Sequence, residues 1–214
     1  PSIWVKRTIK KYSNPIDDLP GTGAEFAEHL IKRFNIEGVK VEKTSQGGDH
    51  YSPHEKMVRL SPDNYDGRSI SAVTIAAHEV GHAIQYHLDE PITKLRQQYT
   101  PIVMIVEKLS IGLISLCPVL IAIFKAPQIG LLSVFAGIIA LVISILLQLI
   151  ILPMEWDASF KKAYPIIEQG NYLEPSQLPA VKQILKAAAM TYVASTLSSI
   201  FSIWRWLAIL KGIR

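Results

Sequence analysis

The sequence predicts an α+β fold: a mostly helical part with a small β-sheet, interrupted by a transmembrane helical hairpin and completed by a helical C-terminal part. Hydrophobic residues make up 49% of the 214 residues and charged residues only 19%, which is too apolar for an ordinary soluble domain. Within residues 102–152 the charged residues are Glu107, Lys108 and Lys125. Outside that segment, apolar residues recur at helical spacing, as in the stripe of Phe26, Ala27, Leu30 and Ile31.

The first part, residues 1–98, is expected to hold two helices and two strands. Thr22 and Glu25 form a capping-box pattern that starts a helix, and the region of Gly38 ends it. The stretches "VKVEKT" and "KMVRLS" are typical of short strands, with a polar stretch at residues 45–55 between them. A longer helix is expected over about 69–87.

The second part, residues 102–152, is predicted to be a transmembrane hairpin with helices over about 102–124 and 129–152. Residues 129–152 contain no charged side chain. As a helix they span roughly 36 Å, which is enough to cross a hydrocarbon core of about 30 Å. The short link "KAPQ" at residues 125–128 joins the two helices.

The third part, residues 153–214, is expected to complete the first. Another helix is expected to start near Pro153. Further on, residues 187–210 form a third apolar stretch that is rich in small residues and interrupted by Arg205. This stretch either spans the membrane or lies along its surface, with Trp204 and Trp206 at the level of the headgroups.

The net charge limits the kinds of binding partner to be expected, and the cysteine count limits the possible disulfides. The net charge is +4, and four cations crowd the start of the chain: Lys6, Arg7, Lys10 and Lys11. These cations suit anionic lipid headgroups or a solvated basic tail, and no nucleic-acid-binding motif accompanies them. The single cysteine, Cys117, excludes an intrachain disulfide.

The helix over 69–87 carries an H-E-x-x-H pattern in "TIAAHEVGHAIQYH". His78 and His82 are four residues apart, so their rings project from one face at the separation that two zinc ligands need. Glu79 lies beside them, where it can act on a water as a general base. Small apolar neighbours indicate a buried helix, and Gly81 is expected to leave the approach to the metal open.

A third zinc ligand must come from elsewhere in the chain. Glu155 is the preferred candidate, because a chain that crosses the membrane twice returns to the side on which the histidines lie. His87 is the alternative, but it is one residue short of the spacing in zincins with a third histidine. Glu107 lies too near the membrane, and Glu168 falls in a stretch rich in turn residues.

Basic residues flank the predicted hairpin unevenly. Lys94 and Arg96 precede it and Lys161 and Lys162 follow it, whereas the link contains only Lys125. Since lysine and arginine favour the cytoplasmic side, the part with the histidines is expected in the cytoplasm.

These residues resemble the YugP family of neutral zinc metallopeptidases, which are bacterial integral membrane proteins. The resemblance rests on "HEVGHAIQ", "DHYSPHEKMVRLSPDNY", "LPMEWDASFKKA", "GTGAEFAEHLIK" and "AAAMTYVAS". It implies a zincin-like (gluzincin) catalytic domain in a bacterial inner membrane, with His78, His82 and Glu155 as Zn²⁺ ligands and Glu79 as general base. The family also tends to begin with a membrane helix, and whether one precedes Pro1 stays open.

The resemblance also implies roles for surrounding residues. Gluzincins usually carry E-x-x-x-D, whose aspartate orients a zinc-bound histidine, but here Ser159 stands at that position and Asp157 lies two residues earlier. The strand "MVRLS" would be the sheet edge that pairs with an extended substrate. Contacts to the substrate or the transition state are expected from a further group, which could instead be ordinary loop and core residues: His50, Tyr51, His54 and Tyr192.

The predicted function is therefore a membrane-bound zinc metalloprotease that acts on peptides or proteins. One alternative is an intramembrane zinc protease, which the polar ends of the helix over 69–87 disfavour. The other is a non-catalytic zinc-binding scaffold or chaperone, which Glu79 disfavours because a structural site needs no base. The lipid bilayer is an expected partner, nucleic acid is not, and the oligomeric state stays open.

Overall fold

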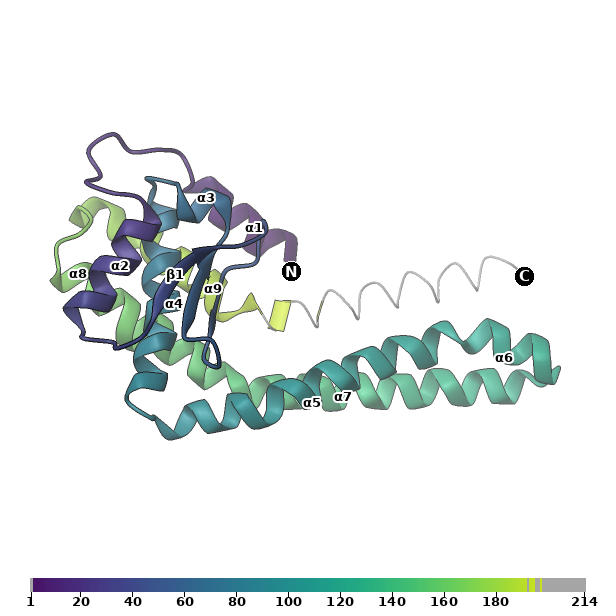
Figure 1. The fold of residues 1–214 in the computed structure, drawn as a ribbon. Coiled ribbons are helices and arrows are strands. Elements are labelled where there is room, and N and C mark those ends of the chain that lie inside the picture. The colour runs from purple at the N-terminus through teal and green to yellow at the C-terminus, as the bar shows by residue number, and fades with distance from the viewer. Residues whose placement is uncertain (1, 192, 195–196, 198–214) are drawn as a thin grey trace. The chain divides into compact units, whose positions relative to one another are not determined.

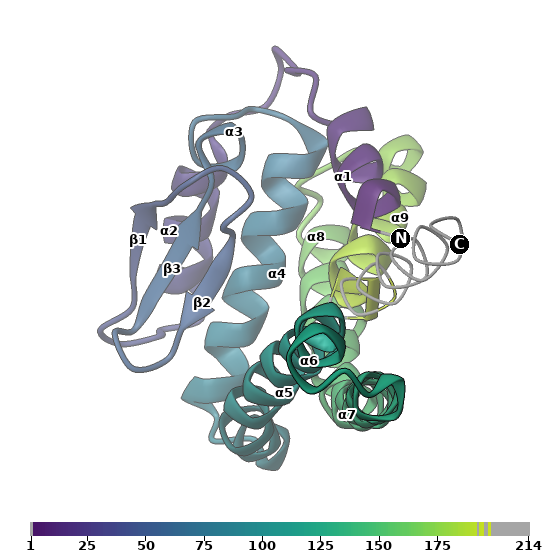
Figure 2. The same ribbon diagram turned by 90° about the vertical axis from the view of Figure 1, so that its right-hand side faces the viewer.

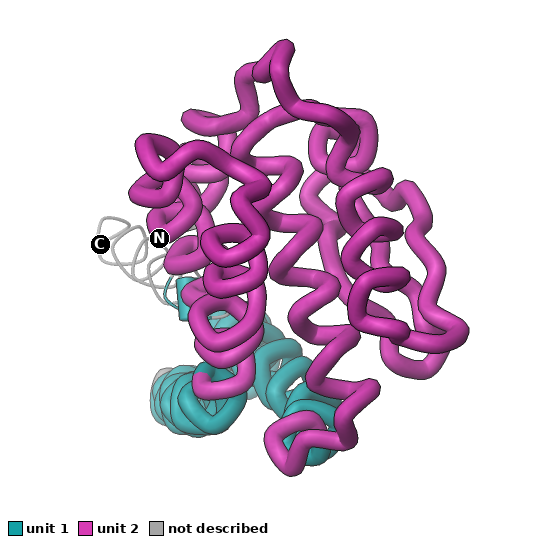
Figure 3. The backbone as a smooth tube through the Cα atoms, turned by 90° about the vertical axis from the view of Figure 1, so that its left-hand side faces the viewer, with its two compact units in different colours: residues 1, 94–152, 192–214 teal, residues 2–93, 153–191 magenta. Residues whose placement is uncertain are grey.

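The computed structural model describes residues 2–191, 193–194 and 197, which fall into two compact units (Figure 1, Figure 3). We call residues 2–93 and 153–191 the core unit, and residues 94–152 the hairpin unit. Within the third apolar stretch, Tyr192, residues 195–196 and residues 198–210 lie outside the described residues.

The core unit contains a three-stranded sheet in the order β1-β3-β2. β1 (Lys40–Lys43) runs parallel to β3 (Met57–Leu60), and β2 (His50–Ser52) runs antiparallel to it. β1 and β3 confirm the two predicted strands, whereas β2 lies in the stretch that was expected to be a polar loop. Because β3 is the central strand, the expectation that it forms the edge of the sheet is wrong.

The sheet and α2 (Gly23–Arg33) pack through alternating and periodic apolar residues. Val58 and Leu60 on β3 are fully buried, and so are Ala27 and Leu30 on α2. Thr22 caps α2, and the predicted capping box with Glu25 is present. The helix ends at Arg33 rather than near Gly38. Phe34, the next residue, leaves the helical conformation, and Asn35 adopts a positive φ.

The central helix of the core unit is α4 (Ile70–His87), which confirms the predicted helix. Ser69 caps it by accepting a hydrogen bond from the backbone N–H of Ala72. In Figure 2 the sheet and α2 lie on one side of α4, with α8 (Tyr164–Gln169) and α9 (Leu178–Ala189) on the other. Residues 71–83 are all buried, so polar side chains in this stretch face the protein interior.

Two short helical segments hold the start of α4 in place. α3 (Pro62–Tyr65) lies between β3 and α4 in the chain. The basic N-terminal segment forms a helix, α1 (Ser2–Lys11), where a tail was one expectation. The Ser71 hydroxyl donates to the Ile9 carbonyl, and the Tyr12 hydroxyl donates to Gln183 on α9. Tyr12, just after α1, and α1 itself, through its contacts with α9, therefore connect the two sequence segments of the core unit.

The chain re-enters the core unit through α7 (Pro127–Trp156), which continues into a π-helical segment, η1 (Asp157–Ala163), and then α8. A 3₁₀ turn, η2 (Pro175–Gln177), precedes α9. Pro153 lies inside α7, so the expectation that a new helix starts there is wrong. Pro153 has no backbone N–H, so one helical hydrogen bond is missing. The complete burial of Met154 and Ala158 helps to offset the free energy that this loss costs.

The hydrophobic core draws on both sequence segments of the core unit. Before the hairpin, it includes Leu30, Val58 and Val80; after it, Ile184 and Leu185. All five are fully buried. The two segments bury these apolar side chains in one shared core.

Gly81 lies where α4 meets η1. A Cβ atom at this position would lie 2.8 Å from the backbone oxygen of Ala158 and 3.5 Å from its Cα. The glycine therefore allows two helical backbones to approach closely, which corrects the expectation that it opens a path to the metal. This approach sets the spacing between the residues that α4 and η1 carry.

Replacing Gly81 with alanine is expected to destabilise the protein. Overpacking costs about 1–3 kcal/mol, which exceeds the roughly 1 kcal/mol that alanine gains over glycine within a helix. Thermal unfolding in detergent measures the effect. Gly112→Ala is the matched control, because nothing lies within 4 Å of a Cβ there, and its melting temperature should stay equal or rise. Equal melting of both variants would contradict the close contact.

The hairpin unit consists of α5 (Pro91–Ser115) from Lys94 onward, α6 (Cys117–Phe124) and the first part of α7. Lys125, with a positive φ, and Ala126 make the turn, in agreement with the predicted link. The helices touch closely at two glycines of α7: a Cβ would lie 2.3 Å from Ile121 at Gly130 and 2.5 Å from Ile114 at Gly137. Such close glycine contacts are typical of helix pairs in membranes.

One continuous helical stretch in the described part of the chain is long and apolar enough to cross a membrane: Gln128–Gln169, which runs through α7, η1 and α8. Only 28% of its most apolar window is buried, unlike the core helix of a soluble protein. α5 and α6 together are long enough to form a second membrane-crossing helix only if the 45° bend between them lies inside a single membrane span. The bend precedes Pro118, whose missing N–H weakens the helix.

Candidate metal centre

His78, Glu79 and His82 are all buried on α4, with exposed fractions of 4%, 6% and 1%. The two histidine rings are stacked edge to face one turn apart, with their centroids 4.7 Å apart. Helical geometry and the burial of α4 on both sides produce this arrangement. Imidazoles held in the interior need polar partners, because burying them without partners costs free energy.

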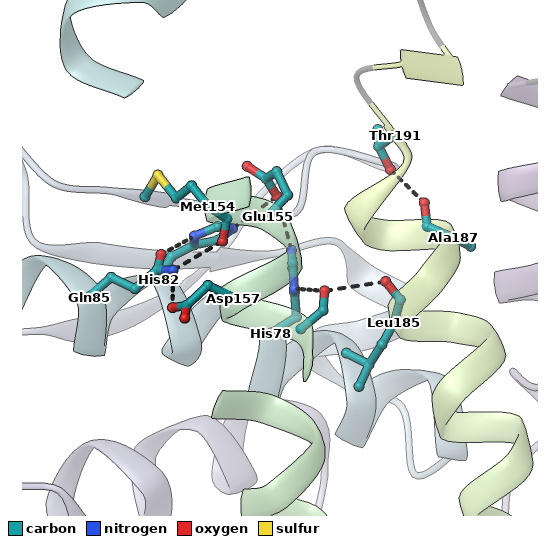
Figure 4. Close-up of polar contacts among 10 residues, drawn as sticks. His78, His82, Gln85, Met154, Glu155, Asp157, Leu185, Ala187 and Thr191 are labelled. Carbon is teal, nitrogen blue, oxygen red and sulfur yellow. Dashed lines mark hydrogen bonds and ion pairs between the residues drawn. The ribbon is translucent and has the colours of Figure 1, made fainter. Parts of the chain in front are cut away.

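Glu155 reaches the two histidines from the last turn of α7 (Figure 4). Its Oε2 atom lies 3.2 Å from His82 Nε2 and 3.5 Å from His78 Nε2, and its exposed fraction is 3%. The three ligand atoms lie within 4.8 Å of one another. Within the described residues, no other group of three histidine, cysteine or acidic side chains converges in this way.

The other nitrogen of His78 is held by Ser159 on η1. Ser159 Oγ lies 3.0 Å from His78 Nδ1 and donates to the Leu185 carbonyl at 3.2 Å. Since a hydroxyl has one proton, which goes to the carbonyl, Oγ accepts the proton of Nδ1–H. The Nε2 atom of His78 therefore keeps its lone pair, on the side where Glu155 lies. This is the tautomer that a metal ligand requires, so the group fits a zinc ion.

The other nitrogen of His82 faces Gln85, also on α4. Gln85 Oε1 lies 2.9 Å from His82 Nδ1, and Gln85 Nε2 donates to the Met154 carbonyl at 3.0 Å and to Asp157 at 2.8 Å (Figure 4). Gln85 was missed in the sequence, although it lies within the quoted motif "HEVGHAIQ". A lone glutamine on a buried helix face was the available signal.

Asp157 contacts Gln85 and two lysines. Its carboxylate forms an ion pair with Lys162, and it lies 3.6 Å from Lys161. Burial on its own would raise the pKa of Asp157, but hydrogen bonds from Lys162 and Gln85, together with the charge of Lys162, hold that pKa below its ordinary value. Of the two residues considered for orienting a zinc-bound histidine, Ser159 thus contacts His78 directly, whereas Asp157 contacts Gln85.

The remaining predicted residues do not join this group. His50 donates from Nδ1 to the Gly48 carbonyl at 2.6 Å, and His54 is exposed in the turn after β2. Tyr51 is buried against Tyr86, with ring centroids 5.6 Å apart. Burial, followed by the proximity of Tyr86, raises the pKa of Tyr51, so its hydroxyl stays protonated. The substrate contacts expected of these residues stay a prediction.

His87, the alternative third ligand, is the exposed last residue of α4. Glu168, the other carboxylate considered, is exposed on α8 and accepts a hydrogen bond from Tyr164. Neither residue belongs to the buried group described above. Tyr192, also expected to contact the substrate, is outside the described residues.

Comparison with known proteins adds an independent observation. Residues 1–211 match the family described as "Putative neutral zinc metallopeptidase". The chain is also similar to the "Putative membrane protease YugP" of Bacillus subtilis (strain 168). The identity is 35% over 213 residues, which cover 97% of this chain and 91% of that protein. No solved structure matches the chain.

Proposed function

Because the chain belongs to this family of zinc metallopeptidases, we propose that it is a membrane-bound zinc metalloprotease that hydrolyses peptide bonds. The family match confirms the resemblance seen in "HEVGHAIQ" and "LPMEWDASFKKA". A peptidase of this family acts on peptides or proteins.

The observation that carries the proposal is the convergence of three buried ligand atoms: Nε2 of His78, Nε2 of His82 and Oε2 of Glu155. Two histidine nitrogens and one glutamate oxygen form one of the sets of three protein ligands found in catalytic zinc sites. Such a set leaves further coordination positions for water and substrate. We therefore assign these three residues as the ligands of Zn²⁺.

The division of chemical roles follows from this assignment. A zinc ion supplies Lewis acidity, which acidifies water and polarises the carbonyl of a peptide bond. Glu79, next to His78 and buried on the same helix, takes the proton from the attacking water and delivers it to the leaving amine. Ser159 holds the ring of His78, taking the place that an aspartate has in the E-x-x-x-D pattern.

The edge strand β2 is the proposed place for the substrate backbone. β3 is paired on both sides, whereas β2 pairs with β3 alone among the described strands and contacts α4. An extended peptide can add to such an edge as a further strand. This assignment replaces the one predicted for "MVRLS".

The proposal also includes the membrane. The apolar helix of Gln128–Gln169 and the name of the B. subtilis relative support a hairpin that spans the bilayer. The basic residues flanking residues 102–152 then favour a cytoplasmic core unit, as in a bacterial inner membrane.

Thiol labelling of intact bacterial cells tests this topology. In a Cys117→Ser background, Lys125→Cys should react with a membrane-impermeant reagent from outside the cell. Lys161→Cys, at a side chain that is 75% exposed, should react only after the cells are permeabilised. The opposite pattern would invert the orientation, and equal labelling of both in intact cells would contradict a spanning hairpin.

Metal content and hydrolysis of the detergent-purified full chain test the central proposal. We expect about one zinc per chain, cleavage of unfolded casein, loss of cleavage with a chelator and recovery with zinc. Zinc without cleavage would favour the scaffold alternative, and a wild-type protein that binds no zinc would overturn the proposal.

A further inference from the structure

A chain of polar contacts leads away from His82 and ends at the start of α5. Gln85 links His82 to Asp157, and Asp157 pairs with Lys162. Lys162 Nζ also lies 2.9 Å from Oε1 of Glu90. Gln85 is fully buried, and the side chains of Asp157 and Lys162 are only 13% and 12% exposed. All of these residues belong to the core unit.

From this chain of contacts we propose that Gln85 is a positioning residue for His82, and that Lys162, through Asp157, holds Gln85 in the orientation that it needs. The proposal rests on the zinc site proposed above. It concerns residues that are not ligands and do not touch the reacting atoms. Their effect is to fix which nitrogen of His82 carries the proton.

The orientation of the Gln85 amide follows from its partners. The Met154 carbonyl and the Asp157 carboxylate only accept hydrogen bonds, so both must face the NH₂ end of the amide. Oε1 is thereby turned to His82, where it accepts the proton of Nδ1–H. Nε2 of His82 keeps its lone pair on the side of Glu155. A flipped amide would set its oxygen against two acceptors and leave a buried donor beside Nδ1.

Lys162 stabilises the second anchor of that amide. A carboxylate as buried as Asp157 needs a compensating charge, and Lys162 supplies one while also pairing with Glu90. Lys161 is the contrasting neighbour: it lies 3.6 Å from Asp157, and its side chain is 75% exposed. An exposed pair of this kind contributes little. The two adjacent lysines therefore form a matched pair for experiment.

The sign of the Lys162 effect separates the proposal from simple electrostatics. Removing a cation near a Zn²⁺ site strengthens zinc binding if the charge acts only through space. If Lys162 acts by holding Asp157 and Gln85, removing it weakens zinc binding. The two explanations predict opposite changes in the dissociation constant.

Zinc dissociation constants, measured by competition with a chromogenic chelator, test the proposal on the detergent-purified full chain. Gln85→Met keeps the length and apolar bulk but loses the hydrogen bonds, and we expect zinc affinity to fall about 10- to 100-fold. Lys162→Met should give a smaller loss in the same direction, and Lys162→Arg should recover much of it. Lys161→Met should stay within about twofold of the wild type, as expected for an exposed charge.

Melting of the metal-free variants distinguishes positioning from general stabilisation. A purely structural role would lower the metal-free melting temperature and leave the zinc affinity of the folded fraction unchanged. If Gln85→Met does not fold, the comparison of Lys162→Met with Lys161→Met decides the question alone. Wild-type zinc affinity in a folded Gln85→Met or in Lys162→Met would overturn the proposal, as would equal losses in the two lysine variants. A wild type without zinc would instead overturn the proposed function.

Discussion

Glu79→Gln is expected to abolish casein hydrolysis while the protein keeps its zinc. Glutamine is nearly the same size as glutamate, so α4 and its buried surroundings should be preserved. The amide cannot take a proton from water, and general-base catalysis contributes about 10²- to 10⁴-fold to a rate. Because Glu79 is not among the three convergent ligands, the zinc dissociation constant should change little. Steady-state cleavage rates and metal analysis of the same preparation measure both quantities.

Glu79→Asp provides the graded control. It keeps the carboxylate but withdraws it by one methylene, so its rate should fall between those of the wild type and Glu79→Gln. Loss of zinc from Glu79→Gln would show that Glu79 supports the metal rather than the reaction. Cleavage by Glu79→Gln at the wild-type rate would place the catalytic base elsewhere.

Glu155→Gln is expected to cause the largest loss of zinc affinity. It replaces the single carboxylate of the convergent group with a neutral amide. The loss should exceed the roughly 100-fold that accompanies removal of a residue that merely orients a ligand. Zinc at about 1,000 times the wild-type dissociation constant stabilises the wild type by about 4 kcal/mol. The same zinc concentration should stabilise Glu155→Gln by less than about 1.4 kcal/mol.

The metal-free proteins should behave differently. The carboxylate of Glu155 is buried beside two imidazoles, and burying a charge costs free energy. Metal-free Glu155→Gln should therefore melt at or above the temperature of the metal-free wild type. Glu168→Gln, at an exposed carboxylate, is the control and should bind zinc like the wild type. Normal zinc affinity in Glu155→Gln would show that the third ligand is another residue.

The features that could be predicted from the sequence depend on local rules. The capping box at Thr22 marks the start of α2, and both of its hydrogen bonds are present. The strands β1 and β3 follow from short apolar stretches between turn residues. The proximity of His78 to His82 follows from the helical repeat alone.

The features that could not be predicted depend on tertiary contacts. β2 is three residues long, with Tyr51 as its one buried side chain, so it is too short for an alternating apolar pattern to mark it as a strand. The central place of β3 comes from parallel pairing with β1 and antiparallel pairing with β2, and strand order is not encoded locally. Pro153 signals a helix start, but packing of α7 overrides that preference.

The residues around the candidate site also divide into those that local sequence predicts and those that depend on tertiary contacts. The spacing of His78, Glu79 and His82 carries a recognisable signal, whereas the role of Gln85 depends on Met154 and Asp157, which follow it by about 70 residues. Gly81 was misread because the backbone of Ala158 that approaches it also belongs to the later segment.

Glu155 lies 73 residues after His82, so the proposed zinc site can be completed only late in the synthesis of the chain. When the ribosome has released α4, the third ligand has not been made, and neither have the residues of α9 that bury the helix. The hairpin must be synthesised in between. A nascent or truncated chain therefore holds the two histidines without the carboxylate that completes the proposed site. If the proposed site is the active one, activity cannot precede synthesis of the segment after the hairpin.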